Sequence, residues 1–103
     1  MNTLTVTIIQ PDLHWEDRKA NLDMLGKKIE SIGEKTEVVV LPEMFSTGFS
    51  MNTEFLAENM GGETILWMKK IAAGKNIIIT GSVIIEDTTA GSRGEKEYFN
   101  RLV

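Results

Sequence analysis

The feature that most constrains the fold of this 103-residue chain is a run of four apolar residues, 38–41, followed at once by Pro42 and Glu43. Three of the four are valines, which favour strands, and proline has no N–H to give to a strand ladder. The run therefore predicts a buried strand over 37–41 that stops directly before Glu43. Ligands of open α/β sheets bind beyond this end of the strands, so Glu43 is a candidate functional residue.

The segments before this strand alternate between strand and helix patterns. Residues 3–9 alternate threonine with apolar side chains, which is the period of a strand with two different faces. Residues 16–32 carry leucine and isoleucine at three- and four-residue steps, which predicts an amphipathic helix that ends at Gly33. A strand, a helix and a strand in this order predict a right-handed crossover between two parallel strands, both of them central in the sheet.

The second half of the chain adds two helices and two strands to this α/β pattern. The patterns predict a short helix at 53–60, a helix at 63–73 that Gly74 closes, a strand at 76–85, a charged hairpin connection at 86–97 and an antiparallel strand at 98–103. The strand at 76–85 is apolar nearly throughout, so we expect it to be covered on both faces. Gly81 and Ser82 are small, which predicts that another backbone or a ligand comes close there.

Charge and hydropathy exclude two classes of partner. Eleven lysines and arginines stand against 15 aspartates and glutamates, a net charge of −4 without a basic cluster, so nucleic acid is not an expected partner. The apolar runs are only a few residues long, and no basic segment precedes one at the N-terminus. We therefore expect no membrane span, no signal peptide and a cytoplasmic location.

Residue types that hold metals or form covalent intermediates are scarce. The chain has no cysteine, and therefore no disulfide, no thiolate metal site and no thiol nucleophile of its own. His14 is its single histidine, and no motif supplies the carboxylate partners that a metal site there would need. Neither a metal nor another cofactor is expected.

Several segments together resemble the nitrilase superfamily of carbon-nitrogen hydrolases. These segments are Gln10-Pro11 after the first strand, Asn21 in the first helix, Val38-Val39-Val40-Leu41-Pro42-Glu43, Thr80-Gly81-Ser82 and Tyr98-Phe99-Asn100-Arg101. Within the superfamily, residues 41–49 are most similar to the ω-amidase branch. The Pro-Glu pair alone is a weak signal, but the resemblance keeps order and spacing along the whole chain.

The resemblance implies a four-layer αββα sandwich, of which residues 1–103 form the N-terminal portion of a single domain, in homodimers or larger homo-oligomers. It also implies hydrolysis of a small ω-amide to an acid and ammonia through a cysteine thioester. Glu43 is then the general base, and a lysine stabilises the oxyanion. The family's lysine and cysteine fall after Val103, and no lysine present, Lys96 included, matches that context. We expect the 103-residue chain by itself to be inactive.

Phe45 and Thr47 are candidate substrate-binding residues, and each has a structural alternative. Phe45 is two residues from Glu43, so its ring either forms a wall of the same pocket or packs in the core. Thr47 either bonds a substrate carboxylate or satisfies its own backbone, as hydroxyls in loops commonly do. Asn100 either borders the site or is structural, and the sequence does not decide between the two.

Two further functions fit the same residues. In a metal-dependent phosphodiesterase, Glu43 would be a metal ligand at the end of a strand, but that class expects an asparagine in the first strand, and residues 3–9 contain none. In a non-catalytic association fragment, an unpaired sheet edge would bind another chain. The chain stops inside its last strand, which is typical of a domain that has been cut.

Overall fold

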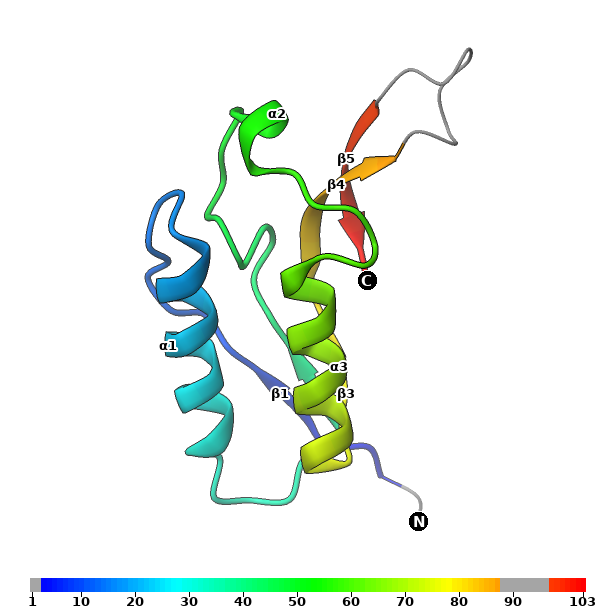
Figure 1. Ribbon diagram of the computed structural model, residues 1–103. Helices are drawn as coiled ribbons and strands as arrows, with labels where there is room; N and C mark the ends of the chain where they lie inside the picture. Colours follow the sequence, from blue (N-terminus) through cyan, green and yellow to red (C-terminus); the bar gives the residue numbers. More distant parts are fainter. Residues whose placement is uncertain (1–2, 88–96) are drawn as a thin grey trace.

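The structure is a computed structural model that describes residues 3–87 and 97–103 (Figure 1). Its elements in chain order are β1 (Val6–Ile8), α1 (Arg18–Glu30), β2 (Val38–Val40), α2 (Thr53–Leu56), α3 (Glu63–Lys75), β3 (Ile78–Thr80), β4 (Ser82–Asp87) and β5 (Glu97–Leu102). Most of the hairpin connection expected at 86–97 lies outside the described residues. The elements follow the predicted order of strands and helices.

The first three strands form one parallel sheet in the order β1-β2-β3. Val39, in the middle of β2, lies between Thr7 of β1 and Ile79 of β3 in the register of this sheet. The parallel pair expected from the strand-helix-strand order is confirmed. Among the described strands β2 is central and β1 forms an edge, so the expectation that both are central is wrong for this part of the chain.

The strand expected at 76–85 is instead two strands in different sheets. β3 ends at Thr80, and β4 begins at Ser82 and pairs with β5 in an antiparallel ladder. A Cβ on the intervening Gly81 would lie 2.7 Å from Cδ1 of Phe45, so the phenyl ring fills the space that a side chain would need. The close approach expected at Gly81 is therefore confirmed, but the expected kind of neighbour is wrong, because the nearest atoms belong to a side-chain ring and not to a backbone or a ligand.

Both long helices end at residues other than the glycines expected to close them. At the start of α1, the Asp17 side chain accepts a backbone N–H of the first turn at 3.1 Å. At its end, Ser31 is the cap residue and Gly33 lies beyond it. α3 continues through Gly74 and ends at Asn76, whose φ is 53°. Asparagine adopts this left-handed conformation more readily than most residues, which is why it can replace glycine as a cap.

The short helix expected at 53–60 is a single turn, α2, after which the backbone extends. Glu58 forms a parallel bridge with Ile85 of β4. The N–H of Glu58 donates to the carbonyl of Ile84 at 3.0 Å, and its own carbonyl accepts the N–H of Glu86 at 2.7 Å. This pairing needs extended backbone, so the bridge to β4 ends the helix early.

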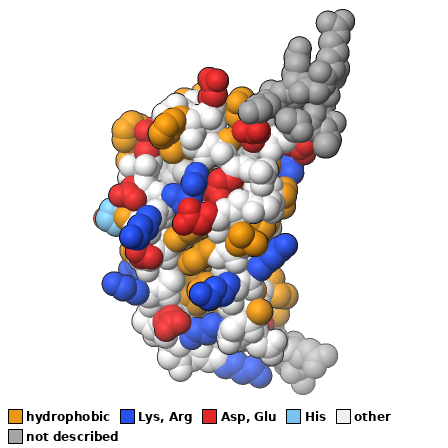
Figure 2. Space-filling model, viewed as in Figure 1, with side chains coloured by type: hydrophobic (Ala, Val, Ile, Leu, Met, Phe, Trp, Pro, Cys, Tyr) orange, Lys and Arg blue, Asp and Glu red, His pale blue; other side chains and the backbone are white. Residues whose placement is uncertain are grey.

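Helices α1 and α3 cover one face of the sheet (Figure 1). Leu25, Ile29 and Val39 are fully buried between these helices and the sheet. Figure 2 shows the outer side of this helix layer, where acidic and basic side chains intermingle. Within residues 3–87 and 97–103, no helix is long and apolar enough to cross a bilayer.

The opposite face of the sheet is apolar and is not covered by another layer of the described residues. Its exposed residues include Val6, Ile8 and Ile78, which are 47%, 64% and 62% exposed. By contrast, the three residues at 83–85 in β4 are all buried. The expectation that the strand at 76–85 is covered on both faces therefore holds for β4 and fails for β3. The described chain supplies one helix layer and the sheet beneath it.

Candidate active site

The turn after β2 carries Glu43 and is bound to β4 through its backbone. The N–H of Met44 donates to Oγ of Ser82 at 2.8 Å, and the N–H of Phe45 donates to the carbonyl of Ser82 at 3.3 Å. Met44 has a φ of 48°, a left-handed conformation that costs a residue other than glycine about 1 kcal/mol. The bonds to Ser82 and the burial of Met44 offset that cost, so the turn is tightly specified.

Glu43 itself is exposed and has one polar partner among the described residues, Asn100 of β5. Nδ2 of Asn100 donates to Oε1 of Glu43 at 2.6 Å. The two side chains line an open pocket of about 320 Å³. The other lining residues are Val40, Leu41, Gly81, Ser82 and Leu102. The structure thus decides the question that the sequence left open for Asn100, which borders the pocket.

Phe45 and Thr47 lie outside the lining of this pocket. Phe45 is fully buried, and the centroid of its ring is 6.0 Å from that of Trp67. Thr47 is 1% exposed, and its hydroxyl donates to the carbonyl of Gly48 at 2.9 Å. These positions match the structural alternatives, core packing for Phe45 and backbone bonding for Thr47. A direct role of either residue in substrate binding stays a prediction.

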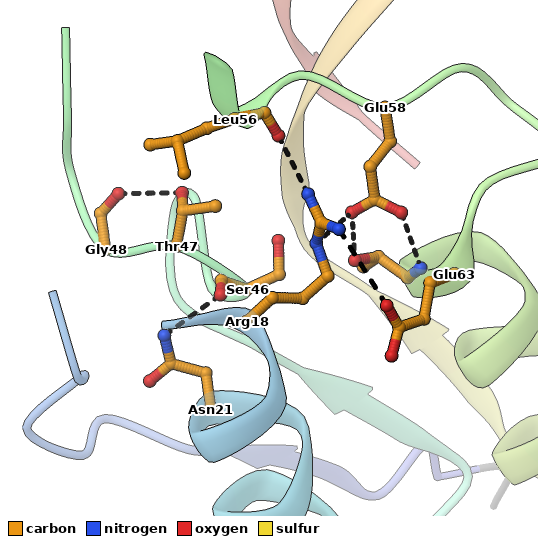
Figure 3. Close-up of polar contacts among 9 residues, drawn as sticks. Arg18, Asn21, Ser46, Thr47, Gly48, Leu56, Glu58 and Glu63 are labelled. Atoms are coloured by element: carbon orange, nitrogen blue, oxygen red, sulfur yellow. Dashed lines mark hydrogen bonds and ion pairs between the residues drawn. The ribbon is translucent and has the colours of Figure 1, made fainter. Parts of the chain in front are cut away.

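A buried asparagine of α1 fixes the far side of the same turn. Nδ2 of Asn21 donates to the carbonyl of Ser46 at 3.0 Å, as Figure 3 shows, and to the carbonyl of His14 at 2.7 Å. Its Oδ1 accepts the N–H of His14 at 2.7 Å. Asn21 lies fully buried beside Leu22. A polar residue on the apolar face of a helix was the available sequence signal for this role, because buried amides need partners.

A second acidic centre, at Glu58, has no counterpart in the sequence analysis. The Glu58 carboxylate accepts the N–H of Thr64 at 2.8 Å and also its hydroxyl proton. Nε of Arg18 forms an ion pair with Oε2 of Glu58 at 3.0 Å, while the Arg18 guanidinium donates to the carbonyl of Leu56 at 3.0 Å (Figure 3). Glu58 is 8% exposed, so this carboxylate is buried but paired and hydrogen-bonded.

Glu58 also replaces the cap that α3 lacks. The N-cap residue of α3 is Gly62, which has no side chain to accept a helix N–H. A Cβ on Gly62 would lie 2.7 Å from Oε1 of Glu58, so glycine leaves room for the carboxylate at the start of the helix. A negative charge there is also favoured by the helix dipole. The Gly61-Gly62 pair directly before α3 was the sequence signal for this site.

Within the described ranges 3–87 and 97–103, no group of three or more His, Cys, Asp or Glu side chains could hold a metal ion. Glu43 and Glu58 are bound instead by an amide, a guanidinium and a hydroxyl. The described part of the site consists of a carboxylate and an amide at the end of a parallel sheet.

Comparison with known proteins shows the family to which the chain belongs. The family model for carbon-nitrogen hydrolases matches residues 5–103. The chain belongs to the carbon-nitrogen hydrolase family. The structure is similar to that of a CN-hydrolase superfamily protein of Xanthomonas campestris, with a TM-score of 0.81 and 30% sequence identity. That solved structure carries an arsenic adduct in its active site. The match covers 98% of this chain and 41% of that one, and it confirms the α/β fold expected from the resemblance.

The curated relatives confirm the resemblance to the ω-amidase branch. The chain is 42% identical over 87 residues to an omega-amidase of Yersinia enterocolitica. This alignment covers 82% of this chain and 32% of the relative. The chain is 38% identical over 93 residues to an omega-amidase of Escherichia coli, covering 89% of this chain and 35% of the relative. A 2-oxoglutaramate amidase of Bacillus subtilis is 30% identical over 83 residues, and this alignment covers 79% of this chain and 32% of the relative. The chain thus spans about a third of the length of these relatives.

Proposed function

We propose that this chain contributes the general base, Glu43, to an amidase that hydrolyses a small ω-amide to an acid and ammonia. The observation that supports this proposal is the position of Glu43, which lies at the carboxyl end of a parallel strand and lines a pocket. Asn100 binds one of its carboxylate oxygens. The names of the relatives, omega-amidase and 2-oxoglutaramate amidase, indicate the substrate class. Family membership favours this reaction over the metal-dependent hydrolysis of a phosphodiester.

In the proposed reaction Glu43 moves protons for a cysteine that lies outside this chain. The carboxylate takes the thiol proton, the thiolate attacks the amide carbon, and a lysine stabilises the oxyanion that forms. Ammonia leaves with the proton that Glu43 returns, which produces a thioester. Glu43 then takes a proton from water as the water attacks the thioester carbon, the C–S bond breaks to release the acid, and Glu43 returns the proton to the cysteine thiolate. Because the chain has no cysteine, we expect residues 1–103 alone to have no amidase activity.

Three accompanying predictions belong to the whole protein. Phe45 and Thr47 are proposed to shape the substrate site from beneath the Glu43 turn. Assembly into homodimers or larger oligomers and a cytoplasmic location stay predictions from the family resemblance and the sequence. The exposed apolar face of the sheet supports the expectation that another layer of protein covers it, since such faces are rarely exposed to water.

The Glu43→Gln variant of the full-length protein tests the proposal. Glutamine keeps the size and can still accept from Asn100, but it cannot take a proton, so we expect kcat to fall by at least about 100-fold. Deamidation of an ω-amide, measured as ammonia release, is the assay. The control is Glu30→Gln, the same change at an exposed position at the end of α1, which should leave kcat unchanged. Near wild-type turnover in Glu43→Gln would remove Glu43 from the mechanism.

A further inference from the structure

The β4-β5 pair presents two polar side chains from one face toward the Glu43 turn. Ser82 pairs with Leu102 and Ile84 pairs with Asn100 in the register of the ladder. Cross-strand partners share a face, and so do residues two apart in one strand, so Ser82 and Asn100 project from the same face. Ser82 bonds the backbone of the turn at Met44, and Asn100 bonds the side chain of Glu43.

The turn is seated on this face by packing as well as by hydrogen bonds. Ile84 is 1% exposed and packs with Met44 and Leu56. The position of Asn100 is therefore set by a paired strand with a packed neighbour, whereas Glu43 lies on a turn. A side chain on a rigid element can orient a side chain on a turn.

Among residues 3–87 and 97–103, the Asn100 amide occupies one oxygen of Glu43 and leaves the other without a hydrogen-bond partner. Oε1 accepts from Nδ2 of Asn100, and no other polar group of the described residues contacts the carboxylate. Glu43 is also the single charged side chain among the described residues that line the pocket. A neutral amide donor can orient a carboxylate without neutralising its charge, as a guanidinium would.

We infer that Asn100 is a positioning residue, which binds Oε1 of Glu43 so that Oε2 is the oxygen that takes the proton. This inference rests on the proposed role of Glu43 as the base. It adds to that role the residue that sets the orientation of the base and the atom that carries out the transfer. Misplacement of a reacting group by about 1 Å can cost roughly 100-fold in rate, so orientation by one amide is a large effect.

The Asn100→Asp variant of the full-length protein tests the inference through the pH profile of kcat/KM. It places a second carboxylate against Glu43, and two carboxylates in contact retain a shared proton to higher pH. We expect the acid limb of the profile to move up by about 1 pH unit or more. The matched control is Asn76→Asp, the same charge change at the opposite end of the sheet, which should leave the limb in place.

The Asn100→Ala variant provides a second measurement that needs no new charge. Loss of the donor frees Glu43 to rotate, so we expect kcat to fall by about 10- to 100-fold while KM changes little. Asn100 is exposed, so neither substitution disrupts a core. If both variants keep the wild-type kcat and acid limb while Glu43→Gln is inactive, the positioning role is overturned and the base role stands. If Glu43→Gln is active, the base role fails and the role of Asn100 fails with it.

Discussion

Glu43 and Glu58 lie in the same connection between β2 and α3, yet the structure treats them in opposite ways. Glu58 is 8% exposed and receives two hydrogen bonds from Thr64 and an ion pair from Arg18. Glu43 is exposed and, within the part of the chain that the structure describes, receives one hydrogen bond, from Asn100. Among the described residues, both oxygens of the Glu58 carboxylate have polar partners, whereas Glu43 has a partner at Oε1 alone.

The difference separates a residue that stabilises the fold from one that can do chemistry. Glu58 ties α1, the bridge to β4 and the start of α3 together, so its bonds are all made within the protein. A general base must instead accept a proton from a group that is not yet there, which requires an unused lone pair at an open site. Burial alone would point to Glu58, whereas the open position proposed for the base belongs to Glu43.

Removal of Glu58 should produce the largest loss of stability. Glu58→Ala removes the closer of the two ion-pair partners of Arg18, so that only Glu63, at 3.8 Å, is left among the described residues. It also leaves the N–H of Thr64 without an acceptor. Since the Arg18 side chain is 29% exposed, we expect a loss at the low end of the buried-pair range, about 3 kcal/mol in the free energy of unfolding. The comparison variant Glu43→Ala should lose no more than about 0.5 kcal/mol. Equal losses in chemical denaturation would contradict the contrast between the two glutamates.

The turn that carries Glu43 depends on the absence of a side chain at Gly81. In Gly81→Ala the new methyl group meets the buried ring of Phe45 at 2.7 Å, and overpacking of this kind costs about 2 kcal/mol. Gly74→Ala is the matched control, because nothing lies within 4 Å of a Cβ there and the residue is inside α3. We expect that variant to gain about 0.5 kcal/mol from helix propensity. Thermal unfolding of both variants would show whether the two substitutions change the stability in opposite directions.

The smallest expected effect concerns the bond between Ser82 and the turn. Ser82→Ala leaves the N–H of Met44 without its side-chain acceptor, which should cost about 1 kcal/mol of unfolding free energy. We expect the effect on kcat to be larger than the effect on the free energy of unfolding, because the same bond positions the backbone that carries Glu43. Ser31→Ala removes an exposed hydroxyl bond at the end of α1 and should change stability by less than about 0.5 kcal/mol. Full activity in Ser82→Ala would show that the turn is positioned without β4.

Short-range patterns were sufficient for the elements and for the place of Glu43. The strand that stops at Pro42, the parallel pair and the two long helices follow from residue periodicity and from the missing N–H of proline, which act within a few residues. The helix ends were less predictable. Gly33 and Gly74 permit a left-handed cap but do not require one, and Ser31 and Asn76 close the helices instead.

Contacts between distant segments decided the features that local patterns did not predict, namely the break between β3 and β4 and the length of α2. Residues 76–85 are apolar nearly throughout, and the break at Gly81 depends on the ring of Phe45, which arrives from the turn after β2. In the same way, the short extent of α2 depends on the bridge from Glu58 to β4.

The sequence by itself determined that a glutamate stands at the end of a parallel strand in a chain of the carbon-nitrogen hydrolase family. Only the tertiary structure decided which partners the two glutamates of this connection receive. Asn100 is 57 residues from Glu43 along the chain, and Arg18 meets Glu58 across two packed elements. Hydrogen-bond partners at such separations are selected by the register of strands and the packing of helices, and no local pattern of residues encodes them.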